Sequence, residues 1–535
     1  MTSRAEDTSG GVAPAGGRSV AEANAKIAAR YDQVPYVSNP FPQSHPSRLA
    51  AVAQLFGLAT PSVERARVLE IGCASGGNII PLAANYPEAD ITGLELSGVQ
   101  ANQGNERISR LGLANARIIN GDVVGYSPDP EQFDFILCHG VYSWASPPAR
   151  AAILAVIAKG LSKNGVAFVS YNVLPGWRHK QVLRDALMSR VHGLTDTSAQ
   201  IAYARGFLEA IKDWNGPDSA YHRDLRETAT HAMTIADDYL AHEFLENYNE
   251  PQTFMQFAEE CAEAKLAFLG ECEMWMQLAD NFETQTQQLL RKLSGNQILP
   301  MEQSIDILTG RTFRQSLLVH ARRQGEIDRT IERSRLAGLH YVGPLRLLPE
   351  AETGFERTYV GGSGRRISTN AKAAQRVFDW MIANEPASLS HDVMLAMAET
   401  EAERAAMIEA VFRSVTAGVI SVRTLPVSAA TQLFDQPRAP AWCRSDAAAG
   451  RSSIANLRHE PVGLDIVGQM LLPLLDGTRN WQDLCVALLD KVRDGELRFS
   501  RNDANVIEPA DIRACADEHV ARTLEQLRAR AVLAA

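Results

Sequence analysis

The chain has 535 residues, of which 53 are Lys or Arg and 63 are Asp or Glu, so its formal net charge is −10. A domain usually has roughly 100–200 residues, and this length therefore predicts about three or four domains. The acidic balance argues against a general nucleic-acid binder, which needs a basic surface, and the 45% hydrophobic content argues against a disordered or fibrous chain.

Residues 1–19 are rich in Gly, Ala and Ser and lack a continuous apolar segment, so we expect a disordered leader and no secretory signal. No apolar run approaches the roughly 20 residues that span a bilayer, which predicts no membrane insertion. The seven cysteines include no CxxC pair, a pattern typical of free thiols in a reducing cytoplasm. No His, Cys, Asp or Glu cluster has metal-ligand spacing, so we expect a cytoplasmic protein without a metal site.

After an expected short helix at residues 20–32, an aromatic and proline-rich segment spans residues 31–49. Its prolines prevent a regular helix and predict an irregular arm. Ser47 is expected to cap the next helix, which runs to about Gly57.

From Arg67 onward, short apolar runs alternate with helical segments. We expect strands at residues 67–71, 89–96, 116–120, 133–139 and 165–172. This alternation predicts an α/β fold, a Rossmann-like doubly wound domain with parallel strands over residues 20–215. Ligands of such sheets bind beyond the carboxyl ends of the strands, so the residues that follow each strand are the candidates for function.

Beyond Arg205 the strand pattern disappears, and residues 216–336 are expected to form a mostly helical domain, including a helix over residues 254–269. The arginine-rich residues 322–335 predict a solvated helix with ion pairs, or else a basic contact for an acidic partner. Residues 337–535 are expected to form a mostly helical C-terminal region with a linker near 428–449. Residues 471–484 in it resemble a winged-helix segment, which on this acidic chain favours docking or dimerisation over DNA recognition.

Three carboxylates follow the first three expected strands. Glu70 opens the turn EIGCASGGN, where dinucleotide-binding folds usually keep an apolar residue; a carboxylate there repels a pyrophosphate but pairs with an ammonium group, directly or through water. Glu95 ends the second strand and is placed to accept both ribose hydroxyls, and Asp122 follows the third and is placed to accept from an adenine amino group. Ammonium, ribose and adenine in this order describe S-adenosylmethionine. The same turns and the end of the fourth strand supply further cofactor-binding candidates: Gly72, Ala74, Gly76, Asn78, Leu96, Val123 and His139.

The pattern ExGxAxG, Glu95 and Gly121-Asp122 resembles the class I S-adenosylmethionine-dependent methyltransferases. Ala74 replaces the usual central glycine, and we expect it to keep a negative φ. Residues 31–46 (YDQVPYVSNPFPQSHP), 139–144 (HGVYSW) and 165–177 (GVAFVSYNVLPGW) are similar to the bacterial methyltransferases with a methyltransferase regulatory domain, a group that includes the rickettsial outer-membrane-protein lysine methyltransferases. The resemblance covers about residues 20–310 and implies a regulatory domain after the methyltransferase domain.

The resemblance also implies roles for residues near the methyl donor. Methyl transfer to an amine needs a neutral nucleophile held about 3 Å from the methyl group, and an apolar aromatic site lowers the pKa of a lysine ammonium. His45 and His139 are the available proton acceptors. The catalytic candidates are Tyr31, Tyr36, His45, His139 and Tyr142, and the substrate-lining candidates are Trp144 and Tyr171.

These residues predict methyl transfer from S-adenosylmethionine to a protein or peptide side chain, with the lysine ε-amino group implied by the resemblance. One alternative is N- or O-methylation of a small molecule or peptide natural product. A second is a catalytically silent regulator that binds S-adenosylmethionine. An NAD-dependent oxidoreductase would need a GxGxxG turn, which this sequence lacks. A homodimer is implied by resemblance alone.

Overall fold

The computed structural model describes residues 32, 38–191, 193–194, 196–246, 248–349, 356–501 and 504–535. The expected leader, the expected helix at 20–32 apart from Asp32, and both Tyr31 and Tyr36 lie outside the described residues. None of the helices in the described part of the chain has the length and apolarity that a bilayer crossing requires.

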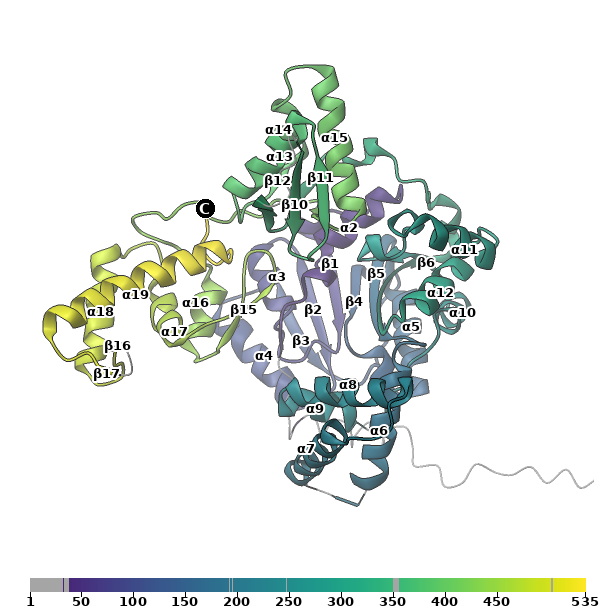
Figure 1. Cartoon of the computed structure of the whole chain (residues 1–535), viewed down its shortest axis with the longest axis horizontal. Coiled ribbons are helices and arrows are strands. Elements are labelled where there is room, and N and C mark those ends of the chain that lie inside the picture. Colours follow the sequence, from purple (N-terminus) through teal and green to yellow (C-terminus); the bar gives the residue numbers. More distant parts are fainter. Residues whose placement is uncertain are drawn as a thin grey trace, which may run out of the picture.

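A seven-stranded sheet forms the centre of the molecule, with strand order β3-β2-β1-β4-β5-β7-β6 (Figure 1). Strands β1 to β5 run parallel to one another, and β7 is antiparallel to both β5 and β6. All six residues of β4 are buried, in keeping with its mostly apolar sequence, and the one charged residue, Asp134, pairs with Arg67 at 2.8 Å. The Rossmann-like fold class is confirmed. The strands are β1 (Arg67–Ile71), β2 (Asp90–Glu95), β3 (Ala116–Asn120), β4 (Phe133–Cys138), β5 (Leu161–Asn172), β6 (Leu266–Glu271) and β7 (Phe313–His320).

Strands β6 and β7 come from the region that we expected to be mostly helical. The expected helix at 254–269 is wrong, because α10 (Phe254–Glu263) ends and Lys265 adopts φ +61°, after which the chain enters β6. The strand pattern of β7 is obscured by two buried polar residues, Arg314 and Ser316, between its apolar residues. Tertiary contacts rather than local propensity therefore decide both strands.

Helices cover the faces of the sheet and form a separate lobe. The helices next to the sheet are α2 (Pro46–Leu55), α3 (Ile79–Asn85), α4 (Gly98–Arg110), α5 (Pro147–Gly160), α10, α11 (Thr284–Ser294) and α12 (Ile298–Thr309). The lobe has its own hydrophobic core and lies at the bottom of Figure 1. It consists of α6 (Arg178–Val191), α7 (Thr197–Asp213), α8 (Ala220–Thr234) and α9 (Asp237–Phe244).

Short 3-10 helices connect these elements: η1 (Pro42–Ser44), η2 (Val63–Arg65), η3 (Tyr142–Trp144), η4 (Met274–Met276), η5 (Ala279–Asn281), η6 (Ala321–Glu326), η7 (Arg333–Leu336) and η9 (Leu472–Leu474). The arginine-rich residues 322–335 contain η6 and η7 and do not form the single helix that we expected. The expected ion pairs are present within the segment, where Arg323 pairs with Glu326 and Arg335 with Asp328. Two further pairs reach other parts of the chain, from Arg322 to Glu131 and from Arg333 to Glu409.

A middle region packs on one face of the sheet and shares its largest hydrophobic core. It appears at the top of Figure 1 and contains two three-stranded sheets, in the orders β11-β10-β9 and β12-β8-β13. Its strands are β8 (His340–Val342), β9 (Leu345–Leu347), β10 (Arg357–Gly361), β11 (Arg366–Thr369), β12 (Leu389–Ser390) and β13 (Ser421–Arg423). Its helices are α13 (Lys372–Ala383), α14 (His391–Ala396) and α15 (Glu401–Thr416).

The C-terminal region forms its own core at the left of Figure 1. Its elements are α16 (Ala441–Ala448), the hairpin β14 (Ser453–Ala455) and β15 (Pro461–Gly463), α17 (Ile466–Leu471), α18 (Trp481–Arg493), β16 (Ser500–Arg501), β17 (Ala504–Asn505) and α19 (Pro509–Ala529). The predicted linker at 428–449 is wrong over α16, because Trp442 and Cys443 are buried there. A buried ion pair between Arg107 of α4 and Asp446 of α16 joins this region to the sheet domain.

Candidate active site

The turn after β1 brings the backbone of residues 72–77 to the end of β2. Gly72 and Gly76 have φ of +73° and +75°, in the left-handed region that favours glycine. Ala74 has φ +50°, so the prediction that it keeps a negative φ is wrong. Its N–H donates to Oε2 of Glu95 at 2.7 Å, a bond that helps hold Ala74 in a conformation that its Cβ disfavours.

Glu95 is buried at the end of β2, where its carboxylate accepts two backbone hydrogen bonds. Oε2 accepts from the N–H of Ala74 at 2.7 Å and Oε1 from the N–H of Ser97 at 2.8 Å. Burial raises the pKa of Glu95, and these backbone bonds limit the rise. Each carboxylate oxygen keeps a further lone pair, so the group retains the capacity to accept from two hydroxyls.

Asp122, Val123 and Leu96 lie in the turns after β3 and β2. Oδ1 of Asp122 accepts from the N–H of Val124 at 3.0 Å. Asn120 ties the two strand ends together, because its Nδ2 donates to the carbonyl oxygens of Glu95 and Leu96, both at 3.1 Å. The residues predicted for ribose and adenine therefore lie at adjacent strand ends.

Glu70, near the end of β1, has a buried carboxylate with only one oxygen bonded. Oε1 accepts from Nδ2 of Asn78 at 2.8 Å, whereas Oε2 has no hydrogen-bond partner among the described residues. Burial, and to a lesser degree the nearby Glu95, raises the pKa of Glu70 to about 8. A buried carboxylate oxygen without a partner is costly, and a ligand ammonium is the kind of group that satisfies it.

Asn78 makes hydrogen bonds to four other residues and holds Glu70 in place. Its Nδ2 donates to Glu70 and to Oγ of Ser44 at 3.0 Å. Its Oδ1 accepts from the N–H of Phe41 at 2.9 Å and lies 2.7 Å from Nε2 of His459. We call these five residues the Glu70 network. Because these bonds use both amide protons and both oxygen lone pairs, Asn78 contributes to a ligand site by orienting Glu70.

His139 follows β4 and faces a ring from the N-terminal arm. The rings of His139 and Phe41 have centroids 3.8 Å apart, and Ser170 Oγ lies 3.0 Å from Nδ1. Ser170 Oγ also accepts from the N–H of Gly140 at 2.8 Å, so this hydroxyl links the backbone after β4 to the imidazole. Burial lowers the pKa of His139 to about 4. The ring is therefore neutral, with one nitrogen as a hydrogen-bond donor and the other as an acceptor.

The structure places Tyr142 and Tyr171 apart from His139. Tyr142 is fully buried and donates to Glu260, and Tyr171 stacks on Phe257 at 4.0 Å. Successive residues of a strand point to opposite faces, so Tyr171 points away from the face on which Ser170 contacts His139. The alternation in β5 is the sequence signal that could have shown this. Trp144 is half-buried with its ring centroid 6.2 Å from that of Trp177.

His45 acts as a helix cap in the structure. Its Nδ1 accepts from the N–H of Ser47 at 3.1 Å, so His45, and not Ser47 as expected, caps α2. Burial and the nearby Arg423 hold its pKa well below the usual range. The lone pair that a proton acceptor would use is occupied by this cap. Tyr36 and Tyr31, the remaining catalytic candidates, lie outside the described residues.

Sequence reasoning missed three residues of this site: Phe41, Ser170 and His459. Phe41 and Ser170 stand in the quoted motifs, and a search for partners of His139 on the same strand face would have found Ser170. His459 lies 381 residues from its partner Asn78, and no local signal points to it.

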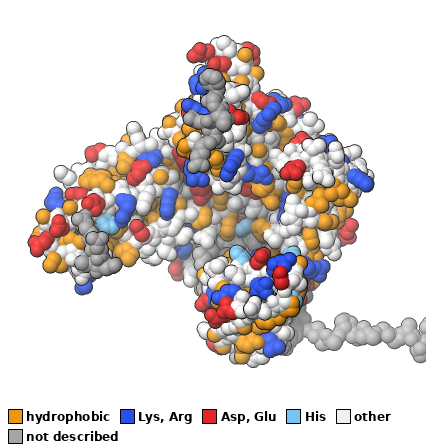
Figure 2. Space-filling model, viewed as in Figure 1, with side chains coloured by type: hydrophobic (Ala, Val, Ile, Leu, Met, Phe, Trp, Pro, Cys, Tyr) orange, Lys and Arg blue, Asp and Glu red, His pale blue; other side chains and the backbone are white. Residues whose placement is uncertain are grey.

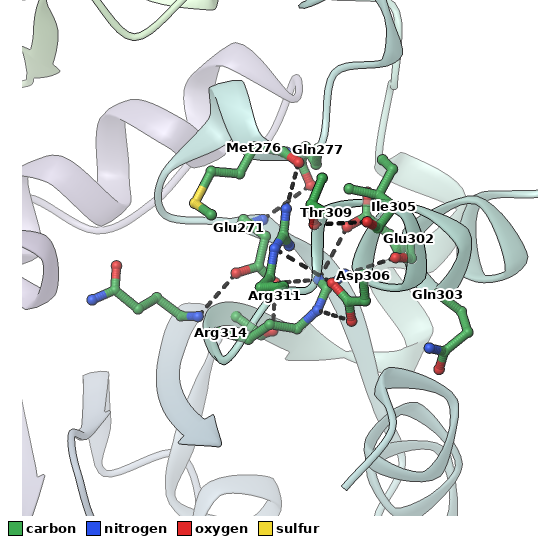
Figure 3. A network of polar contacts seen from close by, with 12 residues as sticks. Glu271, Met276, Gln277, Glu302, Gln303, Ile305, Asp306, Thr309, Arg311 and Arg314 are labelled. Carbon is green, nitrogen blue, oxygen red and sulfur yellow. Dashed lines mark hydrogen bonds and ion pairs between the residues drawn. The ribbon is translucent and has the colours of Figure 1, made fainter. Parts of the chain in front are cut away.

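A second buried polar network lies in β6, α12 and β7 (Figure 3). The guanidinium of Arg314 contacts the carboxylates of Glu271 at 2.7 Å, Glu302 at 3.0 Å and Asp306 at 2.8 Å, and Arg311 lies 3.4 Å from Asp306. We call these five residues the Arg314 network. Burial raises the pKa of Glu302 to about 7, whereas Arg314 holds the pKa of Glu271 below its usual range. In the described ranges no group of three or more His, Cys, Asp or Glu is placed to hold a metal ion.

A Rossmann-like sheet with buried carboxylates at the ends of neighbouring strands is the arrangement expected of an S-adenosylmethionine-dependent methyltransferase. Three family descriptions match the chain: "Methyltransferase domain" over residues 68–165, "Predicted methyltransferase regulatory domain" over 236–320, and "PKMT, C-terminal winged helix domain" over 435–532. The residues fit the donor, because Glu70 offers an unpaired oxygen to its ammonium and Glu95 offers two acceptors to its ribose.

Relatives extend this match over the whole chain. The uncharacterised proteins RP028 and RP789 of Rickettsia prowazekii are 36% and 29% identical; the first match covers 43% of this chain and 92% of RP028, and the second covers 90% of both chains. The structure of PKMT2 from Rickettsia typhi has a TM-score of 0.82 and 27% identity, covering 93% of this chain and all of that chain, and a second structure of it is in complex with AdoHcy. The chain belongs to the family of class I S-adenosylmethionine-dependent methyltransferases with a methyltransferase regulatory domain, and it binds S-adenosylmethionine.

Proposed function

We propose that this methyltransferase acts on a protein or peptide side chain, and specifically on the ε-amino group of lysine. The observation that carries the proposal is the likeness to PKMT2 over 93% of the chain, which includes the middle and C-terminal regions as well as the methyltransferase domain. The lysine specificity comes from the resemblance to the lysine methyltransferases, and extra domains provide a large surface that suits a macromolecular acceptor better than a metabolite.

The surroundings of His139 favour an amine acceptor. The rings of Phe41, Phe168 and Phe313 have centroids 3.8, 5.9 and 6.2 Å from that of His139, which is itself neutral. An apolar surface of this kind lowers the pKa of a lysine ammonium and so favours the neutral amine that attacks a methyl group. The donor supplies an activated methyl group when bound, so the protein's task is to position the amine and exclude water.

His139 contributes to this site as a hydrogen-bond donor. We assign the imidazole proton to Nε2, with Ser170 donating to Nδ1, a tautomer that suits contact with a carbonyl or carboxylate oxygen of the donor or of the acceptor peptide. We assign the proton of the attacking lysine to solvent, because Nδ1 of His45 accepts from the N–H of Ser47 and Nδ1 of His139, in the assigned tautomer, accepts from Ser170. The proposal also includes a homodimer and a cytoplasmic location. The seven free, buried cysteines agree with a reducing compartment.

The test is a transfer assay with the full chain and methyl-labelled S-adenosylmethionine on size-fractionated bacterial lysate, followed by mass spectrometry of the labelled products. We expect label on lysine side chains of proteins, and none with the Glu95→Ala variant. Label on a carboxylate or hydroxyl, or only on small molecules, would support the small-molecule alternative instead. Donor binding without any transfer in lysate or purified protein fractions would favour the silent regulator.

A further inference from the structure

The hairpin β14–β15 of the C-terminal region reaches the carboxyl ends of the central strands. His459 in its turn is 3% exposed, and its Nε2 lies 2.7 Å from Oδ1 of Asn78. Its ring also meets that of His45 edge to face, with centroids 5.1 Å apart. A residue of the winged-helix domain is therefore part of the methyl-donor end of the sheet.

The hydrogen bonds around Asn78 fix the direction of this contact. Its Nδ2 must face Glu70, since the carboxylate Oε1 is an acceptor, and its Oδ1 must face the N–H of Phe41. Because Oδ1 is the acceptor, His459 carries its proton on Nε2 and donates to Asn78. A continuous path of donors thus runs from His459 through Asn78 to Oε1 of Glu70.

The backbone of the hairpin turn holds the imidazole in this position. His459 has φ +66°, a left-handed conformation that a residue with a Cβ adopts only when its surroundings impose it. The turn is held by Asn456, whose carbonyl accepts from the N–H of His459 and whose Oδ1 accepts from the N–H groups of Arg458 and Glu460. Arg423 of β13 donates to the carbonyl of Arg458. Glycine would relax this backbone, so the imidazole itself has a role there.

We propose that His459 is a positioning residue of the methyl-donor site. By fixing Asn78, it holds Glu70 with Oε1 engaged and leaves Oε2 available for the ammonium of S-adenosylmethionine. The C-terminal domain thereby sets the affinity for the donor, besides any contact it makes with the acceptor. This inference rests on the identity of the donor and is independent of the lysine specificity proposed above.

The test compares donor binding by calorimetry in the full-length wild type and three variants. His459→Gly removes the imidazole and relaxes the turn, so it is expected to fold, yet to bind S-adenosylmethionine about tenfold more weakly. His459→Gln keeps a side-chain N–H donor and is expected to recover most of the affinity. Arg458→Met is the matched control, because Arg458 is the adjacent residue of the same turn and bonds Glu385 and Glu460 without touching Asn78.

A His459→Gly variant that keeps its melting temperature and binds the donor within threefold of wild type would overturn the proposal. An equal loss of affinity in Arg458→Met would also overturn it, because affinity would then follow the docking of the hairpin as a whole. If His459→Gly does not fold, the His459→Gln variant decides. An affinity more than tenfold below wild type, at an unchanged melting temperature, would contradict the hydrogen-bond path from His459 to Glu70. Near-wild-type affinity would support it. Absence of donor binding in the wild type would instead refute the methyl-donor assignment.

Discussion

The Glu70 network and the Arg314 network are both built around buried carboxylates, but they differ in what neutralises them. In the Arg314 network two guanidiniums lie among three carboxylates, so most of the negative charge is compensated within the protein (Figure 3). In the Glu70 network the carboxyl group of Glu70 contacts only the amide of Asn78, and its other oxygen has no partner among the described residues. Buried carboxylates paired with cations of the protein hold the fold together, whereas a buried carboxyl group that has a raised pKa and an unpaired oxygen indicates a ligand site.

The largest effect is expected when the paired network loses its cation. Arg314→Met leaves Glu271, Glu302 and Asp306 buried without the guanidinium that contacts all three, and should lower the free energy of unfolding by about 3–5 kcal/mol. Urea unfolding measures this. The control is Arg333→Met, which removes a half-exposed pair with Glu409 and should lower the free energy of unfolding far less. Equal costs for the two variants would show that the Arg314 network does not stabilise the fold.

For the Glu70 network we expect a large change in donor binding and little change in stability. Glu70→Gln should weaken S-adenosylmethionine binding about ten- to a hundredfold, because the amide lacks the charge that pairs with the donor's ammonium. Its free energy of unfolding at pH 7 should stay within about 1 kcal/mol of wild type, since the raised pKa leaves Glu70 mostly protonated there. Calorimetry measures the affinity for the donor, and urea unfolding of the same preparation measures the free energy of unfolding. Unchanged affinity would remove Glu70 from the donor site.

The smallest effect is expected at Glu302. Its pKa is about 7 in the folded protein, above the ordinary value of 4.5, so the folded state holds its proton more tightly than the unfolded state. Its contribution to stability is therefore complete below pH 4.5 and is lost as the pH rises through 7. Glu302→Gln should change stability little at pH 5 and reduce the decline between pH 5 and 8. A decline of the same size in the variant would assign it to other groups.

Local sequence signals predicted the parallel strands and the carboxylates that follow them, because strand alternation and strand-end position are local properties. Strand β7 was missed because the residues that complete its polar contacts, Glu271 and Glu302, come from distant elements. The aromatic residues were predicted by type alone, although the alternation in β5 separates Tyr171 from Ser170. The bond from His459 to Asn78 depends on how two domains dock, which no window of sequence contains.

Oε2 of Glu70 is expected to bind the ammonium of S-adenosylmethionine. The most direct test of this assignment is the release of a proton when the donor binds. Free Glu70 has a pKa of about 8 and is mostly protonated at pH 7, and pairing with an ammonium should lower that pKa. Wild-type protein is titrated with S-adenosylmethionine at pH 7 in two buffers of different ionisation enthalpy. The difference between the two heats of binding should correspond to the release of close to one proton per site. Glu70→Gln should release none. Equal heats in both buffers for the wild type would contradict the account.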